Sequence, residues 1–193
     1  MANLRQKIKR GREIIKFKKL EFSRILLGWQ IPNNNNQRLI LGFEILASLL
    51  ADGRNSILTK PLKEETNLVE SIYVDVNAGE FGSLLIIEGC CEIKNLLVVE
   101  RKINELLEDL IHNNNEISKE LERAINITKS NYFFNLETPS QLSAFYGNNL
   151  LWGRIDPLRR LKENLEYWSN ENNFKEILSY LSKGNFTLIV ESE

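Results

Sequence analysis

The sequence has 193 residues, of which 42% are hydrophobic and 26% are charged. This length and balance are typical of one globular domain. No apolar run approaches the roughly 20 residues that a bilayer-crossing helix needs, and no apolar stretch follows the basic N-terminus as it does in a secretory signal. We therefore expect a soluble, cytoplasmic protein without a membrane partner.

The basic residues gather near the N-terminus. Residues 1–24 hold nine lysines and arginines against Glu13 and Glu21, although the whole chain has a net charge of −1. Such an arm could bind nucleic acid or anionic lipid. The rest of the chain has no basic stripe with interleaved aromatic residues, so we expect no nucleic-acid partner. We predict a solvated basic arm or linker at residues 1–20 and one domain at residues 21–193.

The first half of the chain mixes helix and strand patterns. Gly11 interrupts the first helical pattern, so only a loose helix is expected there. Asn36 and Gly53 are typical of the start and the end of a strongly apolar helix. The expected elements in chain order are a helix over residues 4–16, a strand over 20–31, an apolar helix over 36–53, a short helix over 55–65, and a hairpin of strands over 72–76 and 81–91.

The second half is mainly helical. Thr138, Pro139 and Gln141 form a capping box with proline at the first helical position, and Gly184 is typical of a helix end. Helices are expected over residues 96–110, 117–132, 138–149, 156–168 and 174–181, before a last strand over 186–190. The order of elements predicts an α+β fold, with helices packed on a single mostly antiparallel or mixed sheet of about five strands.

The sequence contains no recognisable catalytic or metal-binding motif. His112 is the sole histidine, and neither H-E-x-x-H nor H-x-x-E-H occurs. The neighbours Cys90 and Cys91 lie in an apolar strand pattern, where burial raises a thiol's pKa and reduces its reactivity. We therefore predict no catalytic residue, no metal ligand and no cofactor in this chain.

Several segments resemble the insulinase/pitrilysin family of zinc peptidases, which includes the mitochondrial processing peptidases. The residues LILGFEILASLLADGRNSILTKPLKEETNL, 39–68, are similar to a block of that family's C-terminal domain, in which an apolar helix is followed by Ser-Ser-Arg-Leu and Leu-Arg-Glu-x-x-Gly-Leu-Ala-Tyr. ILLGWQIP (25–32), the helical stretch 117–153, IDPLRRLKENLEYW (155–168) and YLSKGNFTLIV (180–190) also fit. The resemblance covers about 170 residues and depends on the order and spacing of all these segments together, because no single motif is specific.

This resemblance implies a non-catalytic C-terminal domain of a zinc-dependent endopeptidase. In the family, zinc lies in an N-terminal domain, and two halves close around an extended peptide. The expected partners are therefore a zinc-binding domain or partner half and a peptide substrate, with zinc held by the partner. An alternative is a proteolytically inactive scaffold or binding protein of the same fold, like the core subunits of respiratory complexes.

The resemblance also suggests two positions that contact substrate. In some family members the arginine and tyrosine of the Leu-Arg-Glu…Ala-Tyr block bind near the scissile carbonyl, and the matching positions here are Lys63 and Glu70. Lysine keeps the charge but lacks the planar fork of arginine. Glutamate is an acceptor only, so it would oppose a developing oxyanion. We expect Lys63 and Glu70 to be substrate-binding at most, and a surface role is the alternative.

Overall fold

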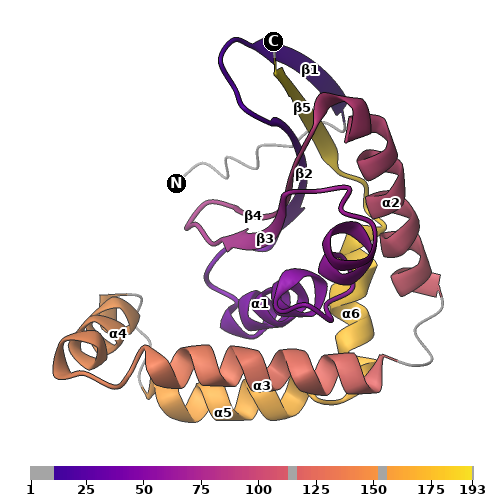
Figure 1. Ribbon diagram of the computed structural model, residues 1–193. Helices are drawn as coiled ribbons and strands as arrows, with labels where there is room; N and C mark the ends of the chain where they lie inside the picture. The colour runs from indigo at the N-terminus through magenta and orange to yellow at the C-terminus, as the bar shows by residue number, and fades with distance from the viewer. Residues whose placement is uncertain (1–10, 113–116, 152–155, 193) are drawn as a thin grey trace.

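The computed structural model describes residues 11–112, 117–151 and 156–192 of the chain. Five strands form one mixed sheet in the spatial order β1-β5-β2-β4-β3 (Figure 1). β1 and β5 run parallel, and the other neighbouring pairs are antiparallel. The strands are β1 (Gly11–Phe17), β2 (Ser23–Ile31), β3 (Ser71–Asn77), β4 (Ser83–Cys91) and β5 (Phe186–Ser192). The predicted α+β class with one mixed sheet is confirmed.

The helices lie almost entirely on one side of this sheet. α1, α2 and α6 pack against it, α3 and α5 lie beyond α1, and α4 projects past the end of α3 (Figure 1). The helices are α1 (Gln37–Ala51), α2 (Leu96–His112), α3 (Ser118–Phe134), α4 (Pro139–Leu151), α5 (Pro157–Trp168) and α6 (Glu171–Leu181), with the short π-helix η1 (Lys60–Glu65) and the 3-10 turn η2 (Ile93–Asn95).

The helix expected over residues 4–16 is wrong where the structure describes it. Gly11–Phe17 forms β1, which pairs with β5 from Gly11↔Phe186 to Phe17↔Ser192. Gly11 is a poor helix former, Ile14 and Ile15 are β-branched, and the free edge of β5 offers a complete ladder. The rest of that predicted helix lies outside the described residues, and the division between an arm and a domain at residue 20 stays a prediction.

Local sequence signals set the predicted helix ends. The side chain of Asn36 accepts a hydrogen bond from the Leu39 N–H at 3.2 Å, and Gly53 has a φ of 82° just after α1. Before α4, Thr138 Oγ1 accepts from the Gln141 N–H at 3.3 Å while Gln141 Oε1 accepts from the Thr138 N–H at 3.1 Å. These contacts satisfy backbone donors that the first turn of a helix leaves unpaired.

The core fills the space between the sheet and the inner helices. Close packing is clearest at Gly42 of α1, where an added Cβ would lie 2.6 Å from Ile177 Cδ1 of α6. Two buried indoles also find acceptors: Trp29 Nε1 donates to the Leu181 C=O at 3.1 Å, and Trp168 Nε1 donates to the Arg38 C=O at 2.6 Å. Since a buried donor without a partner is costly, these bonds fix β2 and α5 against their neighbours.

Candidate functional site

The face of the sheet turned away from the helices carries apolar side chains without a covering layer. The odd-numbered residues of β2, such as Ile25 and Leu27, are fully buried under the helices. Leu26 points the opposite way, and its cross-strand neighbours Glu88 and Leu188 share that face. In the described part of the chain, no helix packs on this side. We call this surface the open face; its apolar members are Leu26, Leu84, Ile86, Phe186, Leu188 and Val190.

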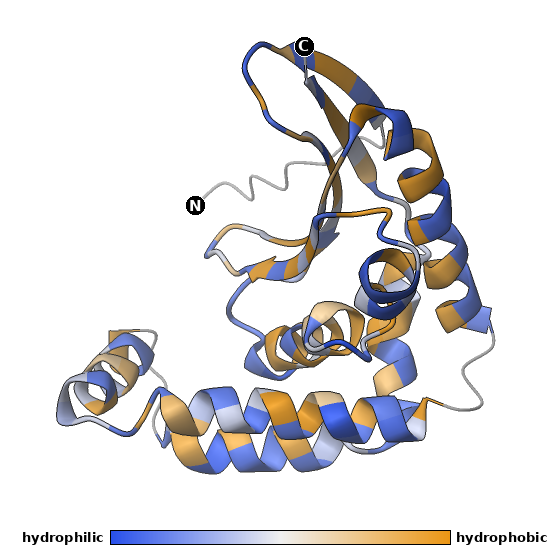
Figure 2. Ribbon diagram, viewed as in Figure 1, coloured by the Kyte–Doolittle hydropathy of each residue, from blue (hydrophilic) through white to orange (hydrophobic). Residues whose placement is uncertain are grey.

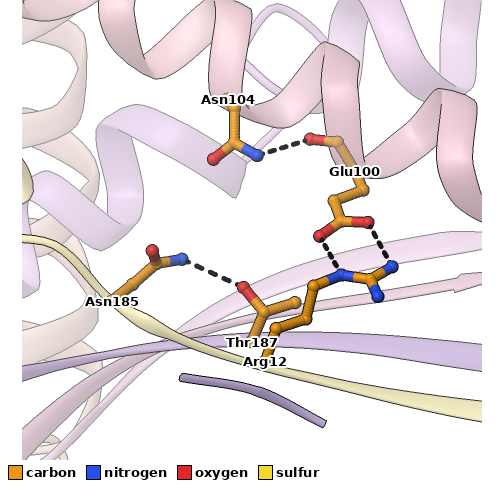
Figure 3. A network of polar contacts seen from close by, with 5 residues as sticks. All are labelled: Arg12, Glu100, Asn104, Asn185 and Thr187. Atoms are coloured by element: carbon orange, nitrogen blue, oxygen red, sulfur yellow. Dashed lines mark hydrogen bonds and ion pairs between the residues drawn. The ribbon is translucent and has the colours of Figure 1, made fainter. Parts of the chain in front are cut away.

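At one edge of the sheet, β1 is exposed at all seven residues. Besides the ladder with β5, it is held by Arg12, whose Nε and Nη2 donate to the two carboxylate oxygens of Glu100 on α2, both at 3.0 Å (Figure 3). Glu100 raises the pKa of the Arg12 guanidinium by this hydrogen bond. Ile15 and Phe17 extend the apolar open face onto this edge strand. A strand so little covered is suited to contact with another polypeptide.

The two positions implied by the resemblance do not line a common hollow. Lys63, on η1, lines a depression of about 190 Å³ together with Asp52 and with Ser71 and Tyr73 of β3. Glu70 does not line it, and its backbone N–H donates to the Cys90 C=O at 2.8 Å. Tyr73 therefore lies near Lys63, and it is three residues after Glu70, the position that the resemblance indicated. Sequence reasoning missed Tyr73, whose side chain is 65% exposed.

The residues that could serve as nucleophile or metal ligand lie apart. His112 is exposed at the end of α2. Cys90 and Cys91 are free thiols, and burial, with help from Cys90 and Glu92, raises the pKa of Cys91 to about 11. Across the described ranges, no three His, Cys, Asp or Glu side chains lie where they could hold a metal ion. This donor set does not fit a zinc site.

A mostly buried carboxylate, Glu44 of α1, was not singled out by the sequence. Its Oε2 accepts a hydrogen bond from Tyr132 Oη of α3 at 2.7 Å. Burial raises the pKa of Glu44, and the Tyr132 bond offsets part of that rise. Glu44 and Tyr132 together line two cavities, of about 370 and 260 Å³. The contact joins residues far apart in the chain, so no local motif could have revealed it.

The strand order and the packing of the helices on one side of the sheet define an α+β domain with one mixed sheet. The model of the peptidase M16 inactive domain matches residues 3–128, which is more than half of the chain. The chain therefore belongs to the peptidase M16 inactive-domain family. The predicted relation to insulinase-type zinc peptidases is confirmed. No curated protein sequence matched the chain.

Solved structures share the fold at low sequence identity. The inactive peptidase domain of a candidate zinc protease from Bordetella parapertussis is 12% identical with a TM-score of 0.74, over 87% of this chain and 91% of that one. A Helicobacter pylori protease is 15% identical with a TM-score of 0.78, over 94% and 44%. A chain of Complex III2 from Candida albicans is 14% identical with a TM-score of 0.78, over 93% and 45%. This chain thus spans less than half of the Helicobacter protein.

None of the helices in the described ranges is both long and apolar enough to cross a membrane.

Proposed function

We propose that this chain is the non-catalytic C-terminal domain of a zinc-dependent endopeptidase, where it packs on a zinc-binding domain or partner half and forms part of the substrate chamber. The observation that carries the proposal is the open face. One side of the sheet is buried by its own helices, whereas Leu26, Ile86 and Leu188 on the other side have no helix over them in the described chain. Burying such a surface on association is the main favourable term in most protein interfaces.

The exposed strand β1 extends the same surface. Ile15 and Phe17 share the side of Leu188 and Val190, so the candidate interface includes the sheet edge as well as its centre. In this arrangement the partner holds the zinc ion, and this chain forms part of the chamber wall and packs against the partner. Lys63 and Glu70 remain proposed contacts for a peptide, with Lys63 the better placed because it lines a depression. Two free cysteines support the expected cytoplasmic location.

The test is association with a zinc-binding family member encoded in the same genome. Co-expression followed by size-exclusion chromatography is expected to give a complex whose peptidase activity is abolished by EDTA, whereas this chain alone is inactive. Leu26→Lys and Leu188→Lys together should break the complex, because each buries a charge in an apolar interface. Leu97→Lys, at an exposed leucine of α2, is the matched control and should leave it intact.

A second candidate is a proteolytically inactive scaffold or binding protein. The similarity in fold to a chain of Complex III2 supports it. This reading predicts a complex that still depends on Leu26 and Leu188 but shows no EDTA-sensitive peptidase activity with any zinc-motif partner. Peptidase activity of this chain alone in a clean preparation, sensitive to EDTA, would contradict both proposals.

A further inference from the structure

A polar hollow of about 840 Å³ lies where the start of α1 meets α5. Both helices are on the covered side of the sheet, so this hollow is separate from the open face (Figure 1). Its wall comes from the loop before α1, the first residues of α1, much of α5 and Glu176 of α6. The volume is typical of a small-molecule site, but the walls are mainly polar, so the ligand that fits them is polar too.

Arg38 of α1 is held in place with most of its hydrogen-bond donors available. Its Cζ lies 4.5 Å from the centroid of the Tyr167 ring on α5, and its Nε donates to Oδ1 of the buried Asn164 at 3.0 Å. Within the described residues, the Arg38 side chain makes no ion pair and no further hydrogen bond. A guanidinium fixed in this way loses little freedom on binding, and its two Nη groups suit an anionic acceptor.

Arg160 of α5 lines the same hollow without being used by the fold. Its side chain forms no hydrogen bond or ion pair across residues 11–112, 117–151 and 156–192. Its neighbour Arg159 differs, because Arg159 Nε lies 3.2 Å from Asp156 Oδ2 and 3.8 Å from Glu163 Oε1. Arginines from two helices, Arg38 and Arg160, are therefore available at one hollow.

The acidic groups of the hollow leave an excess of positive charge. Of the described residues that line it, Glu163 and Glu176 are the acids. Glu163 pairs with Arg159, so Glu176 is left to oppose Arg38 and Arg160. The N-terminus of α1 adds the positive end of its helix dipole, because the first turn holds no acidic residue. The balance favours an anion.

We propose that this hollow binds a phosphorylated small molecule, with its phosphate between Arg38 and Arg160 and its hydroxyl groups against the other polar side chains. A phosphate group offers enough oxygens for two guanidinium groups at once, whereas a single fork already occupies both oxygens of a carboxylate. The hollow is much larger than a phosphate ion, and the carboxamides of Asn33 and Asn35 and the carboxylate of Glu176 provide partners for hydroxyl groups.

The test is an NMR titration of the 15N-labelled full chain with ribose 5-phosphate, ribose and inorganic phosphate. At about 150 mM salt, which screens contacts between exposed charges, ribose 5-phosphate is expected to bind about tenfold more tightly than either other probe. The indole N–H of Trp168, which lines the hollow and donates to the Arg38 C=O, should shift. The indole N–H of Trp29, which donates to the Leu181 C=O, should not.

Three variants separate the two arginines from general charge. Arg160→Gln removes a side chain that no described contact needs, so the chain should fold normally and bind ribose 5-phosphate about tenfold more weakly. Arg38→Lys keeps the charge but loses the fork, and it should weaken binding as well. Arg101→Gln, at an exposed position of α2, removes the same charge elsewhere and should retain the affinity.

Several results would overturn the proposal. These are equal binding of ribose and ribose 5-phosphate, unchanged affinity in Arg160→Gln, shifts centred outside the hollow, or no binding up to about 10 mM. Inorganic phosphate binding as tightly as the ester would also overturn it, because the hydroxyl groups would then contribute nothing. The inference does not rest on the proposed function, whose test uses a zinc-binding partner and Leu26 and Leu188 of the open face.

Discussion

Two leucines that follow one another on β2 have opposite surroundings. Leu27 points to the helices and is 0% exposed, whereas Leu26 points to the open face and stays half-buried among its strand neighbours. The hydropathy colouring shows apolar stretches on the strands as well as on the facing helices (Figure 2). Alternation alone would make one side of a sheet polar, but here the open face combines the ion pair of Arg24 and Glu88 with several apolar side chains. The difference teaches that one face stabilises the fold, whereas the other is the face that we propose for contact with a partner.

The largest effect is expected on the covered face. Leu27→Ala should lower the free energy of unfolding by about 2–5 kcal/mol, because the substitution leaves a cavity between β2 and the helices. Urea denaturation of the isolated chain measures the change. A loss below about 1 kcal/mol would mean that the core is looser than the structure indicates.

A smaller loss is expected between α1 and α6. Gly42→Ala adds a Cβ that would lie 2.6 Å from Ile177 Cδ1 and 2.9 Å from Trp168 Cε2, so side chains or helices must shift. Overpacking of this kind costs about 1–3 kcal/mol, which exceeds the gain in helix propensity. Thermal unfolding followed by circular dichroism measures it. Gly28→Ala, where an added Cβ meets nothing within 4 Å, is the control in the same molecule.

Glu44→Gln should raise the free energy of unfolding rather than lower it, and the size of this effect should depend on pH. Burial raises the pKa of Glu44 in the folded state, so the folded chain binds the proton more tightly than the unfolded chain. The contribution of Glu44 to stability is complete below its ordinary pKa and is lost as pH rises through the raised value. The variant should therefore be the more stable at neutral pH, and its advantage should vanish in acid. Melting temperatures of the unsubstituted chain and of Glu44→Gln, measured from acidic to neutral pH, test the sign of this effect.

The smallest effect on the isolated chain is expected on the open face. Leu26→Ala removes a half-buried side chain with no helix over it, so the free energy of unfolding should fall by less than about 1 kcal/mol. The same substitution should weaken the proposed complex with a zinc-binding partner. If Leu26→Ala destabilises the isolated chain as much as Leu27→Ala, the two faces are equivalent and the comparison fails.

The sequence predicted the elements whose signals are local. Asn36, Gly53 and the Thr138–Gln141 pair mark helix ends through contacts within a few residues, and each lies where it was expected. β1 was missed because its partner, β5, lies at the other end of the chain and no nearby residue indicates it. Glu44 was missed for a similar reason, since its pairing with Tyr132 arises only when α3 packs on α1. In both cases the structure depends on tertiary contacts that no local sequence signal reveals.

The parallel pairing of β1 with β5 has a consequence for synthesis of the protein. β1 leaves the ribosome before β2, β3, β4 and all the helices, and its ladder partner β5 follows all of them. Until β5 emerges, the apolar residues Ile14, Ile15 and Phe17 have no strand beside them. While the elements between β1 and β5 are being made, the nascent chain therefore carries an unpaired apolar strand, which favours protection by chaperones.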